Sequence, residues 1–235
     1  MELKSIPYGN SRIDFSLKRN DRKTLGIKVY PDGSTVVTAP IETPYEKVTE
    51  KVKSKAQWID KQRDFFMFFE PRTKEKIYES GESHLYLGKN YRLKITESNN
   101  NSVKLKGGYI LIEIKDKHNK KLIEKELKKW YKSKAIIHFQ NIFDNRLGLA
   151  KDLSDKETSL KYEWFNNRWG SCFKNGTISL NLELIKSPKE CVDYVIVHEM
   201  CHLVHHNHSK KFYTVLDKKL PNWRDSKEKL ERLLA

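Results

Sequence analysis

The chain has 235 residues, of which 37% are hydrophobic and 11% aromatic, so it is a folded protein long enough for one or two domains. Its formal net charge of +15 favours polyanionic partners such as nucleic acid, although no nucleic-acid-binding motif accompanies it and a solvated, lysine-rich surface is the simpler explanation. We find no signal-peptide pattern and no apolar run long enough to span a bilayer, and the 3 cysteines are an odd number for a disulfide framework. We therefore expect a cytoplasmic protein with no membrane partner.

Residues 1–115 are predicted to form an N-terminal, antiparallel β-rich region that contains one helix. A meander is the simplest arrangement for its first strands. Apolar residues at helical spacing predict a helix from about Pro44 into the aromatic residues at 65–69. Alternation of apolar and polar residues, with turn signals between the runs, predicts strands at residues 13–17, 25–29, 35–38, 86–95, 103–105 and 109–114.

Residues 116–235 are predicted to form a second domain, which begins with a long helix extending to Phe143. Its expected apolar positions include Ile123, Leu127, Trp130, Ile137 and Phe139. No internal repeat is evident along the chain.

A hairpin is predicted next, because Asn175-Gly176 is a strong turn signal between strand-like residues 162–165 and 177–182. Alternation places Ile178, Leu180 and Leu182 on the core side of the second strand. We expect that strand to have a free edge, which is either a site for pairing with an extended peptide or an ordinary edge of the sheet.

The chemistry is indicated by His198-Glu199-Met200-Cys201-His202, an H-E-x-x-H motif. On a helix, residues four apart share a face, so His198 and His202 can bind one zinc ion while Glu199 lies beside it as a general base. We expect the helix to end near Asn207, after which the chain returns His208 as a third ligand. Three histidines and a water make a catalytic zinc site with an open position.

The alternative is that His198 and His202 are ordinary helix residues that bind no metal. The flanking residues argue against it, because they predict that the motif lies on a half-buried helix. Ser187 and Glu190 have capping-box spacing, and residues 192, 196, 200 and 203 are apolar at helical spacing. The spacing to His208 equals that of metzincins, yet His205 replaces their glycine and no later methionine follows, so that class does not fit.

The predicted reaction is metal-assisted hydrolysis, with Glu199 taking a proton from the zinc-bound water and returning it to the leaving amine. A carboxylate that bonds to the far nitrogen of a ligand histidine should orient its ring, and Asp193 and Asp217 are both candidates. The candidates for contacts to the transition state or substrate are Arg168, His205, His206 and Tyr213.

These motifs together resemble the YgjP-like zinc metallopeptidases, relatives of the SprT-like and WLM proteases. The resemblance rests on residues 168–172, 193–203 and 207–209 with Phe212, and on weaker N-terminal matches at residues 31–33, 58–59, 81–82 and 87–88. It implies an α+β fold with a zincin-like core, zinc held by His198, His202 and His208, and Glu199 as general base and acid. Some members of the family are described as nucleotide pyrophosphatases acting on UTP, and the SprT-like relatives cleave proteins crosslinked to DNA.

Three hypotheses therefore follow. The first is a zinc metallopeptidase that cleaves a protein or peptide substrate. The second is a metal-dependent nucleotide pyrophosphatase that uses the same site, with lysines and Arg168 binding the phosphates. The third is a basic nucleic-acid-binding module with a structural zinc, which is disfavoured because structural sites are usually closed by four protein ligands.

Overall fold

The computed structural model describes residues 2–9, 11–30, 32–68 and 76–234; of residues 11 and 65–68 it describes the backbone alone. The structure is α+β, as predicted, and divides into two compact units, residues 1–74 and 75–235. Among the described residues, no helix is both long and apolar enough to span a membrane.

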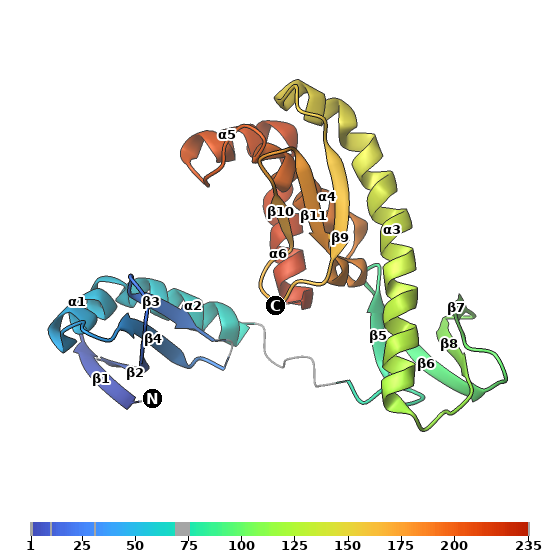
Figure 1. Cartoon of the computed structure of the whole chain (residues 1–235), viewed down its shortest axis with the longest axis horizontal. Coiled ribbons are helices and arrows are strands. Elements are labelled where there is room, and N and C mark those ends of the chain that lie inside the picture. The colour runs from blue at the N-terminus through green and yellow to red at the C-terminus, as the bar shows by residue number, and fades with distance from the viewer. Residues whose placement is uncertain (1, 10, 31, 69–75, 235) are drawn as a thin grey trace. The chain divides into compact units, whose positions relative to one another are not determined.

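The first unit is a four-stranded sheet packed against two helices (Figure 1). Its spatial order is β1-β2-β4-β3, with β2 and β4 parallel, so the predicted meander is wrong. This order places the fully buried Val37 and Ala39 of β4 inside the sheet and leaves the shortest strand at the edge. The strands are β1 (Glu2–Tyr8), β2 (Ser11–Asn20), β3 (Gly26–Val29) and β4 (Thr35–Pro40).

The single helix predicted from Pro44 is two helices, α1 (Tyr45–Ser54) and α2 (Ala56–Phe68), which meet at Lys55. Val48 and Val52 of α1 and Ile59 of α2 are fully buried and pack in the core of this unit. The aromatic end of the predicted helix, residues 65–69, lies outside the described side chains.

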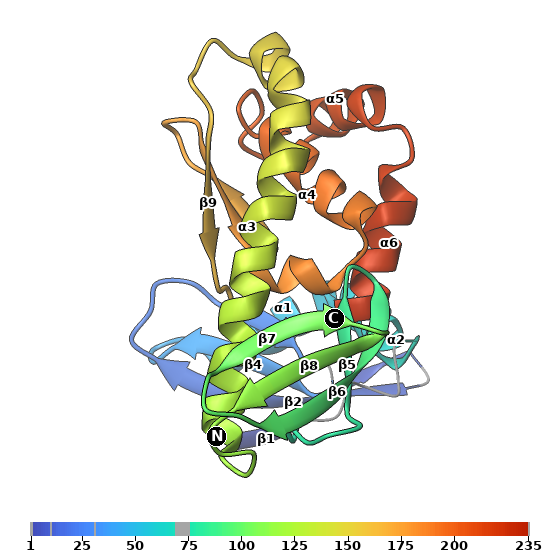
Figure 2. The same ribbon diagram turned by 90° about the vertical axis from the view of Figure 1, so that its right-hand side faces the viewer.

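The second unit opens with another four-stranded sheet, in the order β5-β6-β8-β7 and again with a parallel central pair (Figure 2). The strand order of the first unit is therefore repeated, although the sequence shows no repeat. The strands are β5 (Ser83–Tyr86), β6 (Lys89–Glu97), β7 (Ser102–Lys106) and β8 (Tyr109–Ile114).

This sheet explains why the division between the units differs from the predicted one near residue 115. Its residues Leu93 and Ile112 share one buried cluster with Leu127 and Phe139 of the following helix. That helix, α3 (Lys120–Leu153), is longer than predicted and starts at Asn119, whose side chain accepts a hydrogen bond from the backbone N–H of Leu122. The prediction that Ile137 is an apolar core position is wrong, since 54% of its surface is exposed.

A three-stranded sheet and three helices complete the second unit. Figure 1 shows α4 behind the sheet, and α4 also contacts α3, α5 and α6, so it forms the centre of the unit. The sheet has the order β10-β11-β9, so β11 is an interior strand and the prediction that it has a free edge is wrong. The elements are β9 (Ser159–Glu163), β10 (Gly170–Cys172), β11 (Thr177–Asn181), the 3-10 helix η1 (Leu182–Lys186), α4 (Lys189–Cys201), α5 (Lys210–Lys219) and α6 (Trp223–Leu234).

Candidate metal centre

Helix α4 carries the H-E-x-x-H motif and starts differently from the prediction. Pro188 occupies the N-cap position, and the Ser187 hydroxyl donates to the backbone carbonyl of Leu184 at 2.8 Å instead of capping α4. Glu190 pairs with Lys229 of α6 at 2.8 Å. The predicted capping box is therefore wrong, and the start of α4 is held by its neighbours.

The helix also ends earlier than predicted, at Cys201 and not near Asn207. The N–H of His205 donates to the carbonyl of Cys201, and the tight turn places the carbonyl of His205 2.8 Å from Nδ1 of His202. Nδ1 of His202 donates to that carbonyl, which leaves its Nε2 with a lone pair. The chain then reaches Ser209, the N-cap residue of α5, and this brings His208 back to the end of α4.

Three imidazole rings converge at this point. His198, His202 and His208 each offer a nitrogen, and these atoms all lie within 4.8 Å of one another. Nε2 of His198 and Nε2 of His208 are 2.9 Å apart. The fully buried ring of Phe212 lies 4.9, 4.7 and 4.8 Å from the three ring centres, so one apolar side chain supports all three histidines.

The environment keeps the imidazoles of α4 neutral. Burial, with smaller contributions from His202 and His208, lowers the pKa of His198 to about 3. Burial also lowers the pKa of His202, against the opposing effect of the His205 carbonyl. Neutral imidazoles have the free lone pair that a metal ion requires, so the donor set fits a bound metal.

Glu199 is buried beside this cluster, with 6% of its surface exposed. Burial raises the pKa of its carboxyl to about 7, while the charge of Arg168 and the backbone N–H of Cys172 oppose the increase. The carboxylate lies directly over Gly170 of β10, where an added Cβ would be 2.8 Å from both Cγ and Oε1 of Glu199. The absence of a side chain at residue 170 is therefore what makes room for Glu199.

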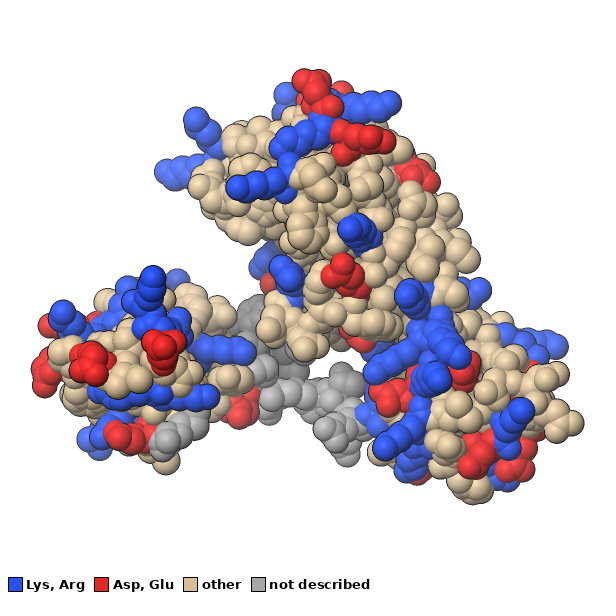
Figure 3. Space-filling model, in the orientation of Figure 1, with Lys and Arg blue, Asp and Glu red and all other residues tan. Residues whose placement is uncertain are grey.

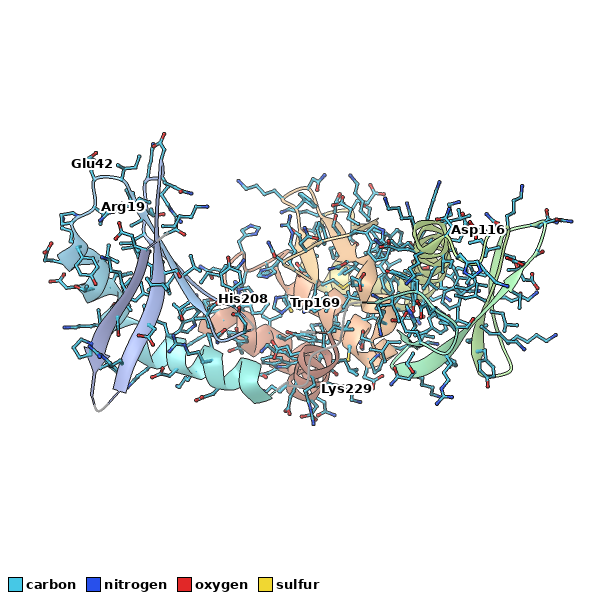
Figure 4. The ribbon with its side chains drawn as sticks, turned by 90° about the horizontal axis from the view of Figure 1, so that it is seen from below. Arg19, Glu42, Asp116, Trp169, His208 and Lys229 are labelled. Carbon is cyan, nitrogen blue, oxygen red and sulfur yellow. The ribbon has the colours of Figure 1, made fainter. Side chains whose placement is uncertain are left out.

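The cluster opens into a cleft of about 410 Å³, and Figure 4 labels His208 and Trp169, which both line it. Its other wall is β10 and the loop before it, which are held by the buried Asn181. The side-chain amide of Asn181 donates to the carbonyls of Phe165 and Arg168 at 2.9 and 3.0 Å, and its backbone N–H donates to the carbonyl of Trp169.

Of the four residues predicted to contact the transition state or substrate, two line the cleft and two do not. Arg168 and His206 line the cleft. His205 contributes its backbone carbonyl to His202 and is not among the lining residues. Tyr213 stacks on Trp223 with ring centres 5.6 Å apart and lies 6.2 Å from the His208 ring, outside the lining.

Neither Asp193 nor Asp217, the carboxylates predicted to orient a histidine ring, bonds to one of the three histidines. Asp193 accepts two hydrogen bonds from Arg146 of α3, at 2.8 and 2.6 Å. Asp217 accepts from the indole of Trp223 and from Arg224. The backbone carbonyl of His205 has the orienting role instead, and Nδ1 of His198 is buried without a hydrogen-bond partner among the described residues.

Sequence reasoning missed the roles of Gly170, Asn181 and Phe212. Phe212 lies only four residues after His208 along the chain, so its closeness to a predicted metal ligand was a usable signal. Asn181 falls on the polar side of the alternation predicted for its strand, so the sequence did not mark it as a buried residue. Nothing in the sequence indicated that the space above Gly170 holds Glu199.

Three histidines that converge beside a buried carboxylate in an open cleft define the class of the protein as a metal-dependent hydrolase. The family described as "YgjP-like, metallopeptidase domain" matches residues 23–233, nearly the whole chain. The chain therefore belongs to the YgjP-like family, and the resemblance found in the sequence is confirmed. A search among curated proteins found no match.

Proposed function

We propose that the protein is a zinc-dependent peptidase whose second unit has a zincin-like core. The observation that carries the proposal is the convergence of His198, His202 and His208 within 4.8 Å, beside the buried Glu199 and open to a cleft. In this proposal the histidines hold the metal, and Glu199 is the catalytic acid and base.

The donor set favours zinc among the common metals. Three imidazole nitrogens suit zinc, and three protein ligands are typical of catalytic sites, whereas structural sites usually have four. No fourth histidine, cysteine or acidic side chain joins the cluster in the part of the chain that the structure describes. When bound, zinc supplies a Lewis acid that polarises a carbonyl group and makes water more acidic.

Glu199 supplies the proton transfers. Its pKa of about 7 is close to neutral pH, where a group both accepts and returns a proton efficiently. The carboxylate accepts a proton from the attacking water and then gives it to the leaving amine. Arg168 and His206 line the same cleft, and in this proposal they donate to the negative charge that develops on the substrate carbonyl.

We propose that an extended peptide substrate binds along strand β10. It pairs with β11 on one side, and among the described strands none pairs with its other edge. Residues 170–172 of this strand line the cleft, so a peptide added to the free edge would pass beside Glu199 and the histidines. Because β11 is an interior strand, the peptide-binding edge that was predicted for it is proposed for β10 instead.

The test compares zinc-loaded wild type with Glu199→Gln on an unfolded protein, alone and with single-stranded DNA, and on nucleoside triphosphates. Glu190→Gln, at the exposed start of the same helix, is the matched control. We expect peptide cleavage that Glu199→Gln abolishes and Glu190→Gln retains, with equal zinc content in all three proteins. Glu199-dependent turnover of triphosphates with no cleavage of the protein would support the pyrophosphatase alternative and refute the peptidase. The presence of Arg168 in the cleft favours that alternative, because its guanidinium can bind phosphates.

A further inference from the structure

A second hollow lies outside the metal centre, along the N-terminal half of α3. It has a volume of about 420 Å³, comparable to a ligand-binding site. Figure 3 shows Lys and Arg side chains gathered over this part of α3. The lining residues are Lys121, Glu124, Lys125, Lys128, Lys129, Lys132 and Trp164, which we call the lysine groove.

The lysines form a stripe along one face of the helix. Lys121, Lys125, Lys128 and Lys132 follow at intervals of four, three and four residues, so they lie one above another over roughly 16 Å of helix. The opposite face is fixed, because it contributes residues such as Leu127 to the buried core. The groove is therefore presented on a rigid element.

Much of this charge is not balanced inside the protein. Lys128 pairs with Glu124 and Lys129 with Glu126, each at 2.7 Å within the helix. In the described part of the chain, no carboxylate lies within 4.0 Å of the ammonium groups of Lys121, Lys125 or Lys132. The side chains of Lys128 and Lys129 are 54% and 60% exposed, so both ammonium groups remain open to another anion, although Glu126 is only 15% exposed.

Trp164 distinguishes the groove from an ordinary solvated lysine surface. It follows β9 directly, and 40% of its surface is exposed where it borders the lysines. Trp presents a flat π face, and proteins that hold single-stranded nucleic acid combine such faces with a positive groove along the backbone.

We propose that the lysine groove binds single-stranded nucleic acid, with phosphates on the lysine stripe and a base stacked on Trp164. Bases in a duplex are already stacked on one another and cannot reach this side chain, so a single strand fits better. An acidic polypeptide would use the lysines but would gain nothing from the exposed indole. The proposal is independent of the peptidase activity.

Binding is measured by fluorescence anisotropy with a labelled 15-nucleotide single strand at several salt concentrations, using the full chain. The triple variant Lys121→Gln/Lys125→Gln/Lys132→Gln should bind more weakly, and its log–log salt slope should fall by about 2, since each lost phosphate contact accounts for about 0.7. The matched control is Lys47→Gln/Lys51→Gln/Lys53→Gln, which removes the same charge from exposed positions on α1.

The indole is tested separately. Trp164→Ala should weaken binding about tenfold with an unchanged salt slope, and Trp164→Phe should restore most of it. Duplex DNA and polyglutamate of similar length are the competing ligands, and both should bind more weakly. The proposal is overturned if the control triple weakens binding as much as the groove triple, if Trp164→Ala has no effect, or if polyglutamate binds as tightly as the oligonucleotide.

Discussion

Gly170→Ala tests the arrangement of Glu199 directly. Gly170 does not have a positive φ, so alanine is allowed by the backbone and the effect is purely steric. The new Cβ would be 2.8 Å from Cγ and Oε1 and 3.0 Å from Cδ of Glu199. Because carbon contacts are normally 3.5 Å or longer, the carboxylate or strand β10 must move by about 0.7 Å.

A shift of this size in the catalytic carboxylate should lower kcat/KM by ~100-fold, since misplacement of about 1 Å has that effect. Overpacking should cost about 1–3 kcal/mol of unfolding free energy. The zinc content should not change, because the three atoms nearest to the added Cβ all belong to Glu199 and none to a histidine. These three quantities are measured by peptide hydrolysis, urea denaturation and metal analysis of the purified protein.

Gly148→Ala is the matched control for the same chemical change. Gly148 lies in α3, and nothing is within 4 Å of an added Cβ, so the variant should be as active as wild type and up to about 1 kcal/mol more stable. Wild-type activity in Gly170→Ala would refute the argument that the glycine makes room for the carboxylate. Loss of zinc in that variant would refute it equally, because the metal ligands would then have moved.

The remaining predictions concern the support of the site. His205→Ala should retain zinc, because only its backbone carbonyl binds His202, whereas His202→Ala should lose most of it; equilibrium dialysis compares the two, and equal losses would contradict the assignment. Arg146→Ala should lower the unfolding free energy by about 1–3 kcal/mol, because it leaves the carboxylate of Asp193 without its two hydrogen bonds, and an unchanged denaturation midpoint would show that the pair contributes nothing. The Cys172 thiol should react slowly with a disulfide reagent at pH 8 in the native protein and rapidly in urea, because burial and the nearby Glu199 raise its pKa to about 11; rapid native labelling would contradict this.

Local features were predictable from the sequence. The spacing of His198 and His202, the return of the chain to His208, and the long helix before them all follow from local patterns, and the structure contains each. Helical periodicity and motif spacing depend on residues close in sequence, where propensity and geometry act directly.

Long-range arrangements were not predictable in the same way. In both four-stranded sheets the fourth strand lies between the second and third, an order that alternation within each strand cannot encode. The boundary between the units was also missed, because strands β5 to β8 look like the strands before them but bury their apolar faces with α3. The site residues Gly170 and Asn181 act through contacts with segments distant in sequence, so no local pattern marks them.

In the proposed site, metal binding and proton transfer depend on different elements packed around α4. The ring of His202 is oriented by the carbonyl of His205, and Phe212 of α5 supports the rings of both His198 and His202. Glu199, on α4, is positioned by β10. Contacts from α5 should therefore govern metal affinity, and contacts from β10 should govern proton transfer. The two sets of contacts share no residue. A substitution in α5 should therefore change metal affinity, and one in β10 should change proton transfer. Metal content and kcat/KM must be measured together to tell the two effects apart.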